Sequence, residues 1–163
     1  MIEPTKTTSL IYSPKIYVMR TPVYHKFYND LGITEPFRQR DGWYEVFQDD
    51  NGEWWLYMNI GFEHNGADCF PDYSYMVFPS AVHDVGLWLI DWGIIPESNN
   101  NIVDQELRDC VELGNEPMPW WKGGNNRTAR KIEAWKIYRA TNLAKTKAGE
   151  KGSLEFLNKR VEI

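Results

Sequence analysis

The sequence predicts an α+β domain in which a small antiparallel sheet packs on about three helices. Two segments typical of strands, 43–47 and 54–62, lie in the first half of the chain. Three segments typical of helices follow, near residues 81–92, 102–113 and 127–145. A run of strands followed by a run of helices favours an α+β fold over a parallel α/β sheet.

Composition divides the chain into a globular domain and two terminal arms. Residues 1–40 contain four prolines, which interrupt regular pairing, so this segment is expected to form an extended N-terminal arm with short strands. Residues 41–145 are expected to form a single globular domain, with enough chain to bury a core. Residues 146–163 are expected to form a C-terminal tail, which begins with a linker rich in Lys and Gly and ends in apolar residues that dock on other surfaces.

The clearest local feature is a hairpin over residues 43–62. Its strands flank Asp49-Asp50-Asn51-Gly52, and an Asn-Gly pair is typical of a two-residue hairpin turn. Apolar side chains alternate along the second strand, which predicts that one face is buried and carries Trp54, Leu56, Met58, Ile60 and Phe62.

The first predicted helix, 81–92, is apolar on almost all sides. Ser80 can serve as its N-cap, and Gly93 lies just past its end. An aromatic loop punctuated by prolines is expected to run from the turn at Asn65-Gly66 up to Pro79. A helix with no polar face is typical of the centre of a domain, so we expect this one to be buried.

The second and third helices are bounded by clear start and stop signals. The second, near 102–113, has Asn101 as its cap and ends before Gly114. The third, near 127–145, follows a Gly- and Asn-rich loop. On or near one of its faces lie Ile132, Trp135 and Tyr138.

Composition also gives the chain an uneven charge. Hydrophobic residues make up 42% and charged residues 25% of the sequence, unlike a disordered chain. Eight Trp, nine Tyr and seven Phe supply either an aromatic core or exposed anchors for a partner. Residues 1–119 hold 7 basic and 19 acidic side chains, whereas residues 120–163 hold 11 and 4. The basic region is either a solvated helix face, which the interspersed acids favour, or a contact for nucleic acid or an acidic partner.

Several other classes of protein are not indicated. Cys69 and Cys110 are far apart and have no Cys-x-x-Cys context, so a metal–thiolate site is not expected. The start of the chain lacks a signal peptide's apolar run, and no stretch approaches the ~20 apolar residues of a membrane-spanning helix. We therefore expect synthesis in a reducing cytoplasm, with free thiols. His25, which lies beside aromatic residues, is interpreted as a surface or interface histidine.

One histidine and two aspartates define the candidate catalytic site. His83 and Asp84 lie in the middle of the apolar helix, where a buried ionisable group needs a partner. Asp104 lies on the flank of the second helix that faces the core, one turn before Leu107. A carboxylate there can receive the ring N–H of His83, which would orient a general base or a metal ligand. The alternative is a structural pair that only satisfies buried polar groups.

Three short sequences in this region carry a resemblance: Gly61-Phe62-x-x-Asn65-Gly66-Ala67-Asp68, Ala81-Val82-His83-Asp84 and Val103-Asp104-x-x-Leu107. Together they resemble an uncharacterised family common in tailed bacteriophages and prophages. Its pattern reads Gly-Phe-x-Thr-Asp-Gly-Ala-Ser, His-Asp-x-Leu-Tyr and Ala-Asp-x-x-Phe. The likeness spans about residues 43–112. This chain has Asn65 in place of the family's Asp, Asp68 in place of its Ser, and no Tyr after the His-Asp pair.

The resemblance implies a structural or assembly protein of the phage tail or neck. It would be made in the host cytoplasm, join the virion, and have other virion or assembly proteins as partners. Nucleic acid contact through the basic C-terminal region is possible but not favoured. The strand-to-loop turn is expected to place three binding residues, His64, Asn65 and Asp68, next to the catalytic set.

A second resemblance, to secreted phospholipases A2, lies in a His-Asp pair on a helix after a Gly-containing loop. It implies His83 as the base for water, Asp84 as a calcium ligand and Asp104 as the orienting carboxylate. The disulfide framework of that family is absent, and the loop holds only Gly66. The alternative function is therefore a metal-assisted or general-base hydrolase acting on lipid or a cell-wall substrate. Its cofactor would be a divalent cation held by Asp84 and Asp68.

Overall fold

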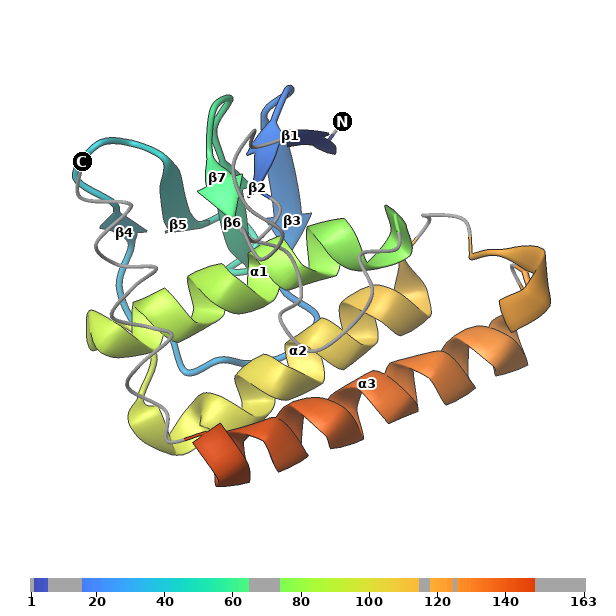
Figure 1. Cartoon of the computed structure of the whole chain (residues 1–163). Helices are drawn as coiled ribbons and strands as arrows, with labels where there is room; N and C mark the ends of the chain where they lie inside the picture. The colour runs from blue at the N-terminus through green and yellow to red at the C-terminus, as the bar shows by residue number, and fades with distance from the viewer. Residues whose placement is uncertain (1, 6–15, 65–73, 115–117, 125, 149–163) are drawn as a thin grey trace.

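The computed structural model describes residues 2–5, 16–64, 74–114, 118–124 and 126–148 (Figure 1). Within these residues, two antiparallel sheets lie on one side of three long helices. The predicted α+β class is therefore confirmed.

The strands of both sheets are short. The first sheet holds β1 (Ile2–Thr5), β2 (Ile16–Met19) and β7 (Glu63–His64) in the order β1-β2-β7. The second holds β3 (Val23–Lys26), β4 (Phe37–Arg38), β5 (Tyr44–Gln48) and β6 (Trp54–Met58) in the order β3-β6-β5-β4. Strand β6 is therefore central in the second sheet, with β3 and β5 as its neighbours.

The predicted hairpin is formed by β5 and β6, but its loop is longer than predicted. The backbones of Asp49 and Glu53 still bond (2.9 Å), so three residues connect the strands. One carboxylate oxygen of Asp49 accepts the amides of Asn51 and Glu53. The other accepts the indole N–H of Trp55. Gly52 adopts the positive φ (82°) that a three-residue loop of this kind requires.

The apolar alternation in β6 predicts its buried face correctly, except at one position. Leu56 and Met58 are fully buried, and Phe62 is buried beyond the strand. Ile60 was predicted to join them but is 56% exposed. Strand β6 ends at Met58, and the turn that follows no longer keeps the two-residue period of a strand.

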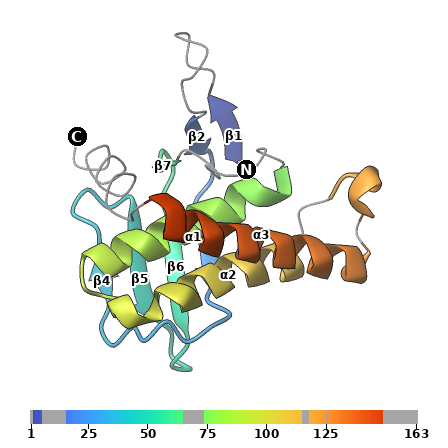
Figure 2. The same cartoon turned by 60° about the horizontal axis from the view of Figure 1, so that its bottom comes forward.

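Three helices and two short 3₁₀ turns complete the described structure. They are α1 (Ser74–Asp91), η1 (Glu97–Asn99), α2 (Asn100–Leu113), η2 (Trp120–Lys122) and α3 (Arg127–Ala148). Helices α1 and α2 lie against the strands, and α3 packs on the side of these two helices away from the strands (Figures 1 and 2).

Helix α1 begins earlier than predicted. It starts at Ser74, so Pro79 lies inside it and the expected loop up to this residue is wrong. Ser80 is not an N-cap, because its hydroxyl donates to the carbonyl of Met76 one turn earlier (2.6 Å). Pro79 is the sixth residue of the helix and cannot donate to the carbonyl of residue 75, but the helix continues through it. The helix ends at Asp91, close to the predicted end.

Two hydrophobic clusters hold the layers together. The larger lies between the second sheet and helices α1 and α2, and it includes Tyr44, Leu56, Met58, Val85, Trp88 and Val103. The smaller joins α3 to α2 and to the beginning of α1, and it consists of Tyr75, Met76, Leu107, Val111, Met118, Ala134 and Ile137.

The predicted domain boundary at residue 40 does not match the packing of residues 17–38. Strand β3 pairs with β6 along its whole length, and the larger cluster includes Met19, Phe27, Leu31 and Ile33. Pro22 and Pro36 each directly precede a strand, a position at which proline is tolerated. This part of the expected arm therefore belongs to the globular unit. Most of the expected C-terminal tail, residues 149–163, lies outside the described residues.

Candidate functional site

His83 and Asp104 come together where α1 and α2 pack against each other. The ring nitrogen Nε2 of His83 lies 2.8 Å from Oδ1 of Asp104. The Asp104 side chain is almost completely buried, whereas that of His83 keeps 13% of its surface exposed. The predicted contact is therefore present. Because Asp104 engages Nε2, Nδ1 is the ring nitrogen that remains to exchange a proton with another group.

The close approach of the two helices here depends on a glycine. A Cβ atom on Gly86 would lie 2.6 Å from Cγ1 of Val103, a distance that no relaxed structure accommodates. Gly86 lies three residues after His83, and Val103 directly precedes Asp104. Residues three apart on a helix share a face, so the contact at Gly86 sets the distance across which His83 reaches Asp104.

The predicted metal pair is only partly within the described structure. Asp84 lies next to His83 in α1 and is buried. Asn65 and Asp68 lie outside the described residues, so their convergence with the other site residues stays a prediction. Within the described residues, the His83–Asp104 pair belongs to no group of three His, Cys, Asp or Glu side chains whose ligand atoms lie within 4.8 Å of one another.

His64, predicted as a binding residue, is buried in β7. Its ring stacks on those of Tyr17 and Phe62, with centroid separations of 5.5 and 6.2 Å. Burial lowers the pKa of His64 to about 3, so its imidazole is neutral near pH 7. In these contacts the ring serves as an aromatic packing surface.

A second buried cluster was missed from the sequence, and it contains His25. The interpretation of His25 as a surface or interface histidine does not fit the structure, because this side chain points inward from β3 and is 6% exposed. Its Nε2 lies 2.8 Å from Oε1 of Glu106 and 3.6 Å from Sγ of Cys110. His25 pairs with Leu56 of β6, a fully buried residue, and therefore shares the inner face of the sheet.

Glu106 is the centre of this cluster. Besides the His25 contact, its Oε1 accepts the backbone N–H of Tyr28 (2.9 Å). Its Oε2 accepts the backbone N–H and the side-chain amide of Asn29 (3.0 and 2.7 Å). A carboxylate has about four acceptor positions, so these four contacts satisfy it. Glu106 thereby fixes α2 to the end of β3, across 77 to 81 residues of sequence.

The surroundings of the cluster are apolar. The rings of Phe27, Tyr28 and Phe78 lie around His25 at centroid separations of 5.4 to 5.7 Å. Burial, together with the negative charges of Glu106 and Asp109, raises the pKa of the Cys110 thiol well above its usual range. The signal in the sequence was a carboxylate on the apolar face of α2, four residues before a cysteine, but it does not reveal the distant histidine.

Four large apolar side chains on η2 and α3 are exposed, and we call this set the η2–α3 surface. It consists of Trp120, Trp121, Ile132 and Trp135. Trp120 and Trp121 are 83% and 63% exposed, and their rings meet edge to face at 6.0 Å. The guanidinium of Arg139 lies 5.2 Å from the centroid of the Trp135 ring.

A polar contact fixes η2 to α3. Glu133 accepts a hydrogen bond from the Tyr75 hydroxyl (2.9 Å) and another from the Lys122 ammonium. Burial opposes ionisation of Glu133, but the contacts with Lys122 and Tyr75, together with the charge of Lys136, outweigh it and lower the Glu133 pKa. A salt bridge between Lys122 and Glu133 thus holds the η2 turn on α3, beside the two exposed tryptophans.

Comparison with known proteins leaves the chain without an assigned family. No protein-family model, curated protein or solved structure matches it. Among the described residues, no helix has the length and apolar character needed to cross a membrane.

Proposed function

We propose that this protein is a structural or assembly component of a tailed-phage virion, in the tail or neck region, that binds other virion proteins. The observation that carries the proposal is the η2–α3 surface. The phage context comes from the resemblance of residues 43–112, which include His83, Asp84 and Asp104.

The exposure of this surface supports a docking role. Single exposed apolar side chains are common on soluble proteins, but adjacent exposed tryptophans are not. Trp120 and Trp121 leave most of their indole area in water. Tryptophan is also among the residues that contribute most to protein interfaces when a partner buries it. The cost of this exposure in the free protein is offset when a partner covers the surface.

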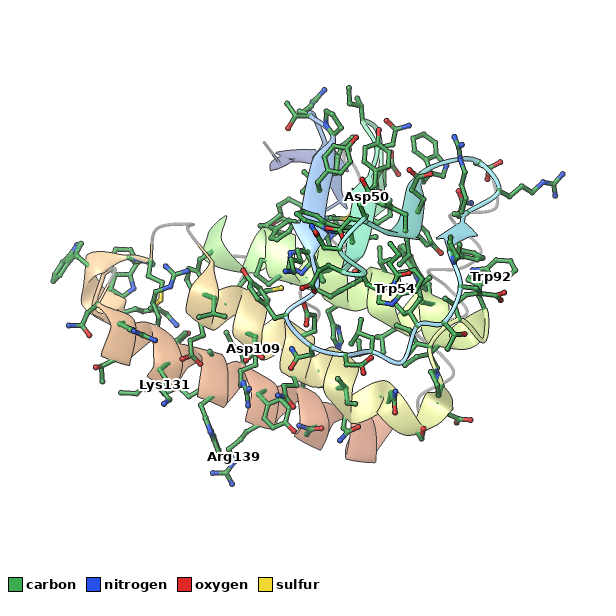
Figure 3. The ribbon with its side chains drawn as sticks, turned by 180° about the vertical axis from the view of Figure 1, so that it is seen from behind. Asp50, Trp54, Trp92, Asp109, Lys131 and Arg139 are labelled. Atoms are coloured by element: carbon green, nitrogen blue, oxygen red, sulfur yellow. The ribbon has the colours of Figure 1, made fainter. Side chains whose placement is uncertain are left out.

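The charge of α3 defines the chemistry of the partner. Helix α3 carries seven basic side chains and one acidic side chain, Glu133. Lys131 and Arg139 point away from the rest of the molecule on the outer side of the helix (Figure 3). Because basic groups alternate with the apolar Ile132 and Trp135, the surface suits an acidic protein face with apolar pockets better than a phosphate backbone.

Particle incorporation tests this proposal. The gene is deleted from the phage, and the protein is supplied in trans as wild type or as the double variant Trp120→Ala/Trp121→Ala. We expect wild type to co-purify with particles on a density gradient. Loss of two interface tryptophans costs about 2 kcal/mol or more, which weakens binding roughly thirtyfold.

The matched control is Tyr24→Ala, which removes an aromatic side chain that is 62% exposed on β3, remote in sequence from the η2–α3 surface. This variant should incorporate like wild type. Absence of the wild-type protein from otherwise complete particles would rule out a virion role. Equal incorporation of all three proteins would rule out the η2–α3 surface as the contact.

A second candidate, a general-base hydrolase, is favoured by the His83–Asp104 bond. Asp104 would orient the imidazole, and Nδ1 of His83 would take a proton from the water that attacks an ester or a cell-wall bond. Asp84 and Asp68 would hold a divalent cation that polarises the bond under attack.

Substrate assays separate the two candidates. Purified protein is incubated with phospholipid vesicles or with peptidoglycan, in the presence of Ca²⁺ or of a chelator. A hydrolase releases fatty acid or soluble sugar fragments, and His83→Gln and Asp104→Asn abolish that release. A purely structural protein releases neither product at any protein concentration.

A further inference from the structure

Three potential metal ligands lie close together in the core: the imidazole of His25, the carboxylate of Glu106 and the thiol of Cys110. We propose that this cluster binds a divalent transition-metal ion of the zinc type through Nε2 of His25, Oε1 of Glu106 and Sγ of Cys110. These three atoms lie within 4.8 Å of one another, and the three side chains are buried. Among the described residues, this is the one group of three such side chains close enough to hold a metal ion. It does not include His83 or Asp104.

One of the two ligand-to-ligand distances matches a tetrahedral zinc site, and the other is shorter. With the usual zinc–nitrogen and zinc–sulfur bonds, ligand atoms at the tetrahedral angle are separated by about 3.6 Å. The His25 Nε2 to Cys110 Sγ distance is 3.6 Å. The nitrogen–oxygen separation would be about 3.4 Å, against 2.8 Å between His25 and Glu106. The metal therefore requires this pair to separate by roughly 0.6 Å as the proton between them is replaced.

Charge balance also favours a divalent ion. Glu106 contributes one negative charge, and a metal-bound Cys110 contributes a second as its thiol proton is released. With a neutral imidazole from His25, the ion and its ligands together carry no net charge. A neutral assembly avoids the cost of burying an uncompensated charge among apolar rings.

The elements around the cluster hold the ligands in position. Glu106 and Cys110 are four residues apart on α2 and so share one face of a rigid helix. Glu106 remains bonded to the backbone of Tyr28 and to Asn29, so its carboxylate is oriented before any ion binds. The Asn29 amide also donates to Asp109 (3.0 Å), which links the cluster to a second carboxylate. Such supporting hydrogen bonds are typical of protein metal sites.

Cobalt titration tests the site in the full-length protein. The reduced, chelator-treated protein is titrated with Co²⁺, whose thiolate charge-transfer and visible absorption report a tetrahedral sulfur-containing site. We expect saturation at one Co²⁺ per chain, displacement of the cobalt by Zn²⁺, and a higher melting temperature with Zn²⁺ present.

Four variants locate the binding. Cys110→Ser should abolish the charge-transfer band, and His25→Gln, which keeps a donor toward Glu106, should weaken cobalt binding at least tenfold. Cys69→Ser and His83→Gln are matched controls and should leave the spectrum unchanged.

Two results would overturn the proposal, whether or not the Cys110 variant folds. One is wild-type protein that binds no cobalt at equimolar concentration. The other is a charge-transfer band that survives in Cys110→Ser or disappears in Cys69→Ser.

Discussion

The substitution Glu106→Gln tests the hydrogen bonds that join the sheet to α2. The carboxylate accepts four contacts, from His25, Tyr28 and Asn29, at 2.7 to 3.0 Å. Glutamine keeps one acceptor oxygen and places an amide NH₂ where the other oxygen was. Two of the four donor groups then face N–H groups and have no acceptor. Each buried donor left unsatisfied costs about 1–3 kcal/mol. We therefore expect the free energy of unfolding to fall by about 2–6 kcal/mol, a large part of the ~5–15 kcal/mol that stabilises a typical domain.

Urea unfolding at equilibrium measures this change, with tryptophan fluorescence and far-ultraviolet circular dichroism as independent probes. A chelator is included so that a bound metal does not add to the difference. The matched control is Glu112→Gln on the same helix, where the side chain makes no hydrogen bond to the described residues. It should change stability by less than about 0.5 kcal/mol. If Glu106→Gln is equally mild, the carboxylate does not hold the two layers together.

Three further substitutions probe other parts of the fold. Gly86→Ala places a Cβ 2.6 Å from Val103, so the free energy of unfolding should fall by about 1–3 kcal/mol, and unchanged urea stability would show that the helices separate without cost. The His64 pKa is lowered to about 3 in the folded state, so its contribution is present above about pH 6.5 and is lost as pH falls toward 3. From pH 7 to pH 4, the melting temperature of the His64→Phe variant should therefore fall less than that of wild type. Equal falls in the two melting temperatures would contradict this. His83→Ala leaves buried Asp104 without its imidazole, so a structural pair predicts a loss of about 1–3 kcal/mol, whereas a catalytic role predicts loss of turnover with a smaller change in melting.

Local features of the sequence predict the elements that local interactions form. The hairpin was predictable because the alternation around Leu56 and the Asn-Gly turn act over a few residues. The end of α2 at Leu113 was predictable from Gly114 for the same reason. The start of α1 was not, because Pro79 looks like a helix boundary when the tertiary packing of the first turns is unknown.

The candidate sites divide in the same way. The His83–Asp104 contact could be predicted because two ionisable residues on buried helix faces need partners, and few partners were available. The His25–Glu106 contact could not, because it joins a four-residue strand to a helix 81 residues later. Prolines around β3 also suggested an arm instead of a strand.

The link between β3 and α2 has a consequence during synthesis of the chain. Strand β3 pairs with β6, but the donors on and after it meet their acceptor only when Glu106 is available. At translation rates of about 5–20 residues per second, the 81 intervening residues take roughly 4–16 s. For that time the backbone N–H groups of Tyr28 and Asn29 lack the Glu106 carboxylate, and chaperones or proteases can bind this exposed segment. Folding of this protein therefore depends on contacts between distant parts of the chain and is expected to be slow for its length.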